Sequence, residues 1–209
     1  MGSSVIVRLG GLLAIVGGLA ATILGLLYVL QAWGITLDFT AMALSKGHYE
    51  NPVANMLLVG VLAAIAALHF VQRLHYGRWG ALTSVAAFTG IAMVVAGNFM
   101  GELAPTTAAV NIVLLVLGVL AATVGIVGLG IVSISAGVLP RWCGVALIAG
   151  SPPGVGILFL FFTPLGMVGI LPGEVGWALA GIPWIVVGYA AFRAPTRQTR
   201  QPSRVQVEE

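Results

Sequence analysis

Six long apolar runs, joined by short links that carry nearly all of the charge, constrain the fold of this chain more than any other feature. A helix needs about 20 mainly apolar residues to cross the hydrocarbon layer of a membrane. Lipid offers no hydrogen-bond partner to a free backbone group, so each run is expected to be helical. The runs predict an all-α polytopic membrane protein in which residues 1–193 form a bundle of six transmembrane helices. The spans are residues 9–31, 53–72, 80–101, 108–133, 142–163 and 175–192.

The composition excludes two other classes of protein. Of the 209 residues, 59% are hydrophobic and only 7% are charged, whereas soluble domains carry about a quarter charged residues. Such a chain cannot cover a water-facing surface with polar side chains. The net charge of +3 is scattered between the apolar runs, which is typical of topology signals. We therefore expect the lipid bilayer as a partner and no nucleic acid.

The basic residues predict the orientation of the bundle. In a six-span arrangement, eight of the nine basic residues lie on one side of the membrane, and only Lys46 lies on the other. Positively charged links stay in the cytoplasm, so both termini are expected to be cytoplasmic in a multi-pass protein of the cell (inner) membrane. Residues 194–209 are polar and interrupted by proline, and we expect a disordered cytoplasmic tail. The eight residues are Arg8, Arg73, Arg78, Arg141, Arg193, Arg197, Arg200 and Arg204.

The sequence AGSPPGVG interrupts the fifth run. Pro152 and Pro153 have no N–H and crowd the preceding carbonyls, so the helix must open there, and Ser151 could satisfy a freed carbonyl. Pro183 should bend the sixth helix at a similar depth, beside Trp184. Interrupted helices form substrate sites in many transporters, but proline is also an ordinary kink-maker in membrane helices. These residues therefore belong either to a ligand site or to a packing kink.

Polar side chains near the end opposite the arginines suggest a second candidate site. Asn98 and Glu102 are four residues apart and share a helix face, and polar groups inside the hydrocarbon usually face the bundle interior. A shallow polar pocket among the first four helices follows if the polar faces converge. The alternative is that residues within one turn of the interface are simply in contact with water. The candidate ligand-binding residues are Tyr28, Gln31, Asn55, Asn98, Glu102 and Asn111.

Signatures of catalysis and of cofactor binding are missing from the sequence. It contains no His-Glu-x-x-His motif, no phosphate-binding loop and no Gly-x-Ser-x-Gly motif. Of the three histidines only His69 is expected inside the membrane, so a bis-histidine haem site lacks its second ligand, and no zinc-ligand spacing is present. We expect no cofactor, no metal site and no catalytic residue, and hence a protein that is not an enzyme.

Small residues recur at four-residue spacing along the runs. Gly17, Ala21 and Gly25 share one face of the first helix, and Gly97 and Gly101 share one face of the third. Small residues let helix backbones approach closely, which drives association inside lipid. These faces predict a tight bundle, but they could also bind a membrane protein partner or a second copy of the chain.

Two segments of the last third carry a resemblance to known proteins. They are GVLPRWCGVALIAG at 137–150 and GWALAGIPWIVVGYAAFR at 176–193. The chain resembles a family of uncharacterised bacterial six-span integral membrane proteins, in which an LPRW turn opens the fifth helix and a GxxWxxxGYxxxR ending closes the sixth. The resemblance implies a six-helix bundle in a bacterial membrane and transfers no catalytic residue.

Two functions remain open on this reading. One is binding or passage of a small apolar or amphipathic ligand within the helix bundle. The other is a structural or accessory subunit whose small-residue faces dock onto a larger membrane complex. A cavity lined by the polar residues would favour the first, and an unoccupied glycine face would favour the second.

Overall fold

The computed structural model describes residues 2–32, 35, 50–103, 108–162 and 172–194. Within these residues the chain is helical and contains no strand. The helices are α1 (Gly2–Ala32), α3 (Glu50–Gln72), α4 (Gly77–Leu103), α5 (Ala108–Ala136), α6 (Arg141–Ala149), α7 (Pro152–Phe162) and α8 (Pro172–Arg193). The expected all-α fold of the membrane type is confirmed.

Four of these helices are long and apolar enough to cross a membrane. They contain the first four predicted runs, because an unbroken apolar sequence in these runs offers the backbone no alternative to its own hydrogen bonds. The six-span arrangement stays a prediction, since the fifth run is divided between two shorter helices and the apolar stretch of the sixth, Leu179–Arg193, is shorter than the others. The four spanning segments are Val5–Leu27, Asn55–Gln72, Gly77–Met100 and Ala109–Ala136.

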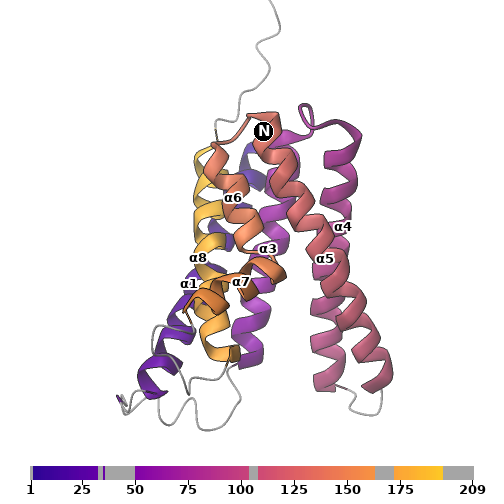
Figure 1. Cartoon of the computed structure of the whole chain (residues 1–209). Helices are drawn as coiled ribbons and strands as arrows, with labels where there is room; N and C mark the ends of the chain where they lie inside the picture. Colours follow the sequence, from indigo (N-terminus) through magenta and orange to yellow (C-terminus); the bar gives the residue numbers. More distant parts are fainter. Residues whose placement is uncertain (1, 33–34, 36–49, 104–107, 163–171, 195–209) are drawn as a thin grey trace, which may run out of the picture.

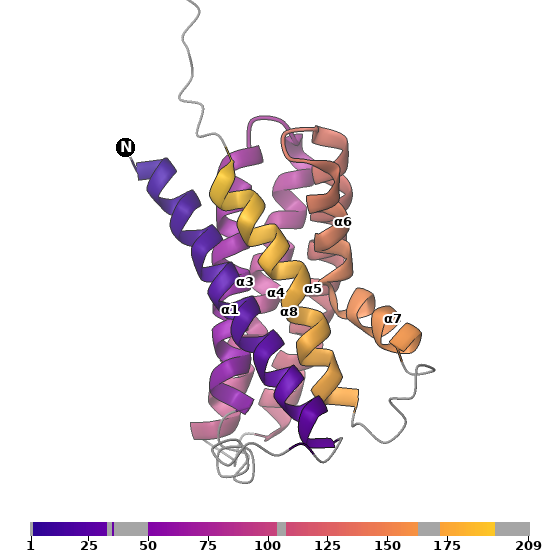
Figure 2. The ribbon, with the colours of Figure 1, turned by 90° about the vertical axis from the view of Figure 1, so that its left-hand side faces the viewer.

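The helices form two groups, which are joined through α6 and through the packing of α3 against α4 (Figure 1). Helix α1 packs between α3 and α8, while α4 and α5 pair with each other. Helix α6 packs against both α5 and α8, and α7 leaves the bundle sideways from the end of α6 (Figure 2). Fully buried side chains mark the core between these helices: Ile65 and Leu68 of α3, Ile126 and Leu129 of α5, and Leu147 of α6.

Glycine allows α1 to approach two neighbours at backbone distance. A Cβ atom at Gly11 would lie 2.6 Å from the carbonyl oxygen of Gly188 in α8, and a Cβ atom at Gly188 would lie 2.6 Å from that of Gly11. On another face of α1, a Cβ atom at Gly17 would lie 2.7 Å from the carbonyl oxygen of Met56 in α3. Ala21, one turn further along, is fully buried. The small residues of α1 are therefore used inside the bundle.

Helices α4 and α5 pair in the same way. A Cβ atom at Gly90 would lie 2.7 Å from the carbonyl oxygen of Gly118, and one at Gly118 would lie 2.8 Å from that of Gly90. Helix α5 then ends where Gly137 adopts a φ of +64°, the left-handed conformation that commonly ends a helix.

The helices begin and end at two opposite ends of the bundle. At the arginine end, α3 ends next to Arg73, α4 begins next to Arg78, α6 begins at Arg141 and α8 ends at Arg193. These four side chains are exposed. At the opposite end, which we call the asparagine end, α3 and α5 begin and α4 ends (Figure 1).

Candidate functional site

The fifth run is broken where the sequence predicts a break. Helix α6 ends at Ala149, and α7 begins at Pro152. Ser151 lies between them and is hydrogen-bonded to both helices. Its hydroxyl donates to the carbonyl oxygen of Ile148 in the last turn of α6 at 2.5 Å, and the same oxygen accepts the N–H of Gly154 in the first turn of α7 at 3.3 Å. Ser151 is thus the N-cap residue of α7, a position at which serine is strongly preferred.

The two prolines occupy the first two positions of α7. A helix leaves its first N–H groups without an internal acceptor, so residues that lack an N–H lose nothing there. Both proline side chains are exposed, whereas Gly150, Ser151 and Gly154 are buried. The break therefore presents its polar atoms to the bundle and its proline rings to the surface.

Helix α8 supports the break from the inside of the bundle. The indole Nε1 of Trp184 donates to the carbonyl oxygen of Gly150 at 3.2 Å, and the Trp184 side chain is 2% exposed. A Cβ atom at Gly150 would lie 3.0 Å from Cβ of Pro183. Pro183 itself lies within a continuous α8.

These contacts explain the presence of four residues at the break by structure alone: Ser151, Pro152, Pro153 and Trp184. The carbonyls of Ile148 and Gly150 and the hydroxyl of Ser151 all have partners within the chain. The packing alternative accounts for them without a ligand, and the hypothesis that these residues bind one stays a prediction.

The asparagine end brings together three of the polar residues selected from the sequence. The Nδ2 of Asn98 in α4 donates to the Oδ1 of Asn55 in α3 at 3.4 Å. This distance is beyond the usual range of about 2.7–3.2 Å, so the two amides are only loosely coupled. Asn55 is nevertheless 9% exposed, and its amide lies between helices.

Asn111 of α5 completes the group. A Cβ atom at Gly97, the neighbour of Asn98, would lie 3.1 Å from the Oδ1 of Asn111 and 3.0 Å from Leu115. That amide oxygen is buried and has no hydrogen-bond partner among the described residues. A buried polar atom without a partner costs about 1–3 kcal/mol. We call Asn55, Asn98 and Asn111 the asparagine cluster.

The sequence predicts three further candidate residues at the asparagine end of the bundle. The side chains of Tyr28, Gln31 and Glu102 lie outside the described part of the structure. Their membership in the cluster stays a prediction.

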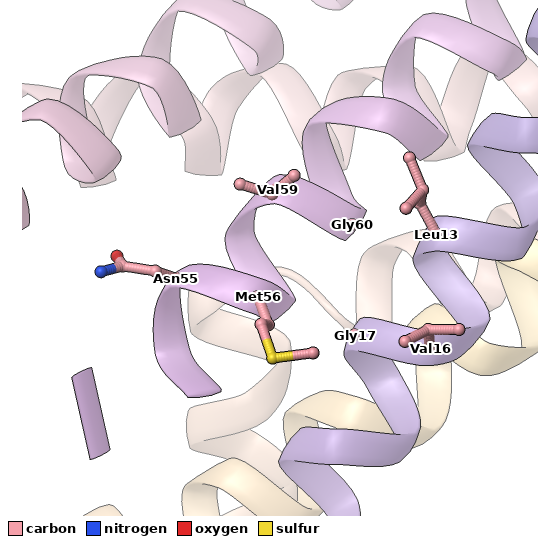
Figure 3. Close-up of a pocket in the computed structure, with 7 residues that line it drawn as sticks. All are labelled: Leu13, Val16, Gly17, Asn55, Met56, Val59 and Gly60. Atoms are coloured by element: carbon pink, nitrogen blue, oxygen red, sulfur yellow. The ribbon is translucent and has the colours of Figure 1, made fainter. Parts of the chain in front are cut away.

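A groove of about 260 Å³ lies beside Asn55, between α1 and α3 (Figure 3). Its walls are almost entirely apolar, with Leu13 and Val16 on α1 and Met56 and Val59 on α3. Asn55 also lines the groove, but its amide points away from α1 in Figure 3.

A second polar group, at the arginine end, was not selected from the sequence. His69 Nδ1 and the hydroxyl of Tyr76 are hydrogen-bonded, and the same hydroxyl lies 3.2 Å from Oγ of Ser84 in α4. Burial of Tyr76 raises the pKa of its phenol above the ordinary value, so the hydroxyl stays protonated at neutral pH. His69 is therefore held by contacts within the chain.

Gln72 and Ser133 extend this polar group toward α5. The Oγ of Ser133 donates to the Oε1 of Gln72 at 3.0 Å, and both side chains are buried. The signal was present in the sequence, because His69, Gln72 and Tyr76 recur at helical spacing at the end of the second apolar run. They were missed because each also fits an interfacial position.

Comparison with protein-family models, with curated proteins and with solved structures finds no match to this chain. The resemblance to a bacterial six-span family is therefore an expectation that rests on the sequence alone. Among the residues that the structure describes, no three His, Cys, Asp or Glu side chains are grouped so that they could hold a metal ion.

Proposed function

We propose that this protein binds a small amphipathic ligand from the membrane, with the ligand's polar group held by the asparagine cluster. One observation carries the proposal: the buried Oδ1 of Asn111 lacks a partner among the described residues. It lies against Gly97, the chain neighbour of Asn98, whose amide bonds to Asn55. An uncompensated acceptor in an apolar environment favours a ligand that carries a hydrogen-bond donor. The expected ligand is therefore an apolar molecule with a hydroxyl or an amine.

The surroundings of Asn111 support the amphipathic character of the ligand. Leu115 lies one turn further along α5, against the same glycine, Gly97. The neighbouring surface of α5 is apolar and exposed, with Val110 and Val113 more than half accessible. An apolar chain can lie on such a surface within the bilayer while its donor reaches Asn111.

The alternative function, an accessory subunit that docks through glycine faces, has less support. The faces around Gly17 and Gly118 are occupied by α3 and α4 of the same chain. A partner protein or a second copy would have to use another surface.

Thermal unfolding of the purified protein in detergent tests the proposal. We expect decanol to raise the melting temperature, and decyl methyl ether, which cannot donate, to have no effect. Asn111→Leu should abolish the effect of decanol and leave the ligand-free protein at least as stable, because it removes an unpaired acceptor. Thr123→Val, on the same helix, is the matched control. Equal stabilisation of native protein and Asn111→Leu would contradict the proposal.

We also propose how the chain crosses the membrane. We place six passages across a bacterial inner membrane, with both termini in the cytoplasm, on the strength of the positive-inside rule. In a Cys143→Ala background, outside labelling should reach His48→Cys and Ala104→Cys but not His75→Cys or Gln198→Cys. Labelling at position 75 from outside would overturn this topology.

A further inference from the structure

A groove at the arginine end lies between α3 and α4 and is separate from the asparagine cluster. It has a volume of about 230 Å³. Ala66, His69 and Phe70 contribute from α3, and Ser84, Val85 and Phe88 contribute from α4. Val85 is 61% exposed and Phe88 is 46% exposed, so the groove opens on the outer surface of the helix pair, where a bundle in a membrane meets lipid.

The wall of this groove is polar at one place. His69 and Ser84 both line it, and both are hydrogen-bonded to the buried hydroxyl of Tyr76. Tyr76 engages Nδ1 of His69, so Nε2 is the ring nitrogen through which His69 could bond to a ligand. A ligand in the groove would thus meet apolar walls and the imidazole of His69.

A positive charge lies next to the groove. The guanidinium carbon of Arg73 is 5.5 Å from the ring centroid of Phe70, a residue of the groove wall. Arg73 is exposed and lies one helical turn beyond His69. Ala66, His69 and Arg73 follow one another at intervals of about one helical turn, from the interior of α3 to the residue just beyond its end. An apolar wall, an imidazole and a guanidinium therefore succeed one another toward the arginine end.

We propose that this groove binds one anionic phospholipid of the leaflet at the arginine end. One acyl chain lies between Phe70 and Phe88, the ester region faces His69, and the phosphate lies against Arg73. Basic residues beside clefts between transmembrane helices recognise anionic lipid head groups in this way. A protein helix is about 10–12 Å across, which is too wide for a groove of about 230 Å³. A groove of this size accommodates a single hydrocarbon chain.

The proposal is tested by lipid binding to the purified full-length chain after delipidation. Native mass spectrometry and thermal unfolding would compare phosphatidylglycerol with phosphatidylcholine of the same acyl chains. We expect preferential retention of phosphatidylglycerol and a larger rise in melting temperature with it. Equal retention of both lipids would overturn the proposal.

Variants assign the effect to the groove. Arg73→Gln should weaken phosphatidylglycerol binding about fivefold and remove the preference over phosphatidylcholine. Arg193→Gln is the matched control, because Arg193 also lies over an aromatic ring, at 4.8 Å from the Tyr189 centroid, and at the same end of the bundle. The control should keep the preference. Loss of the preference in both variants would show a general charge effect and contradict the proposal.

A steric variant tests the acyl chain. Ala66→Leu should fill the groove and reduce binding of both lipids, while Ala96→Leu, at an exposed position elsewhere on α4, should not. If Ala66→Leu does not fold, Thr89→Leu at the exposed rim of the groove serves instead. Unchanged lipid binding in a folded groove-filling variant would overturn the proposed location.

Discussion

Prolines lie inside two apolar runs of this protein, but only one of the two runs is broken. Pro183 lies inside a continuous α8, whereas Pro152 and Pro153 begin a new helix after α6 has ended. One proline removes one internal hydrogen bond, which a long packed helix tolerates. Two consecutive prolines remove two, and at this site they follow a serine that can cap the next helix. Ser151 precedes the two prolines and caps the next helix, whereas Ile182, the residue before Pro183, has no side-chain acceptor that could cap a helix.

The intact run also supports the broken one. Trp184, the neighbour of Pro183, hydrogen-bonds to the carbonyl of Gly150 at the end of α6. The break is therefore held by three elements: the Ser151 cap, the bond from α8 and the close approach of Gly154 to α6. The following variants separate these elements.

Gly154→Ala should have the largest effect. A Cβ atom at this position would collide with the carbonyl oxygens of Ile148 and Ala149, the second at 2.7 Å, and neither backbone oxygen can move away independently. We expect a loss of about 3 kcal/mol in the free energy of unfolding, seen as a lower melting temperature in detergent. Gly156→Ala is the control, because a Cβ atom there meets nothing within 4 Å. It should be neutral or gain up to about 1 kcal/mol.

Trp184→Phe should come next. The variant keeps an aromatic ring in the core but leaves the carbonyl of Gly150 without its donor, at an expected cost of about 2 kcal/mol. Trp142→Phe, at an exposed position of α6, should change stability by less than about 0.5 kcal/mol. Equal melting temperatures for the two variants would mean that α8 does not support the break.

Ser151→Ala should lower stability by about 1 kcal/mol, because α7 loses its N-cap and Ile148 loses a donor. The control is Ser135→Ala, whose exposed hydroxyl bonds to the carbonyl of Val132 in its own helix. A cost no greater than that of the control would show that the cap is dispensable.

The double variant Pro152→Ala/Pro153→Ala should have the smallest effect. Its unfolded state gains conformational freedom, which costs about 0.5–1 kcal/mol, while Ser151 and Trp184 keep their contacts. We expect the break to persist, with an unchanged spin-label distance between positions 145 and 157. A lengthening to about 18 Å, the rise of a continuous helix over this interval, would show that the prolines alone cause the break. Stabilisation by decanol should survive in this variant, because the asparagine cluster is distant in sequence and in different helices.

The sequence by itself determined the class of the protein, the positions of its long helices and the site of the break. These features depend on local chemistry. An apolar run in lipid must satisfy its own backbone groups, and Ser151 followed by two prolines describes the start of a helix within four residues. The sequence also placed Asn98 and Asn111 at one end, because both lie beside the same short link.

Only the tertiary structure decided which side chains meet. The pairing of Asn55 with Asn98, the contact of Trp184 with Gly150 and the bonding of Tyr76 to His69 and Ser84 all join different elements. Such contacts depend on how each helix is rotated about its axis and on its depth relative to its neighbours. In a chain that is apolar on nearly every helix face, periodicity leaves that rotation undefined. The close approach of glycine backbones settles it, and this approach appears only when the helices are packed.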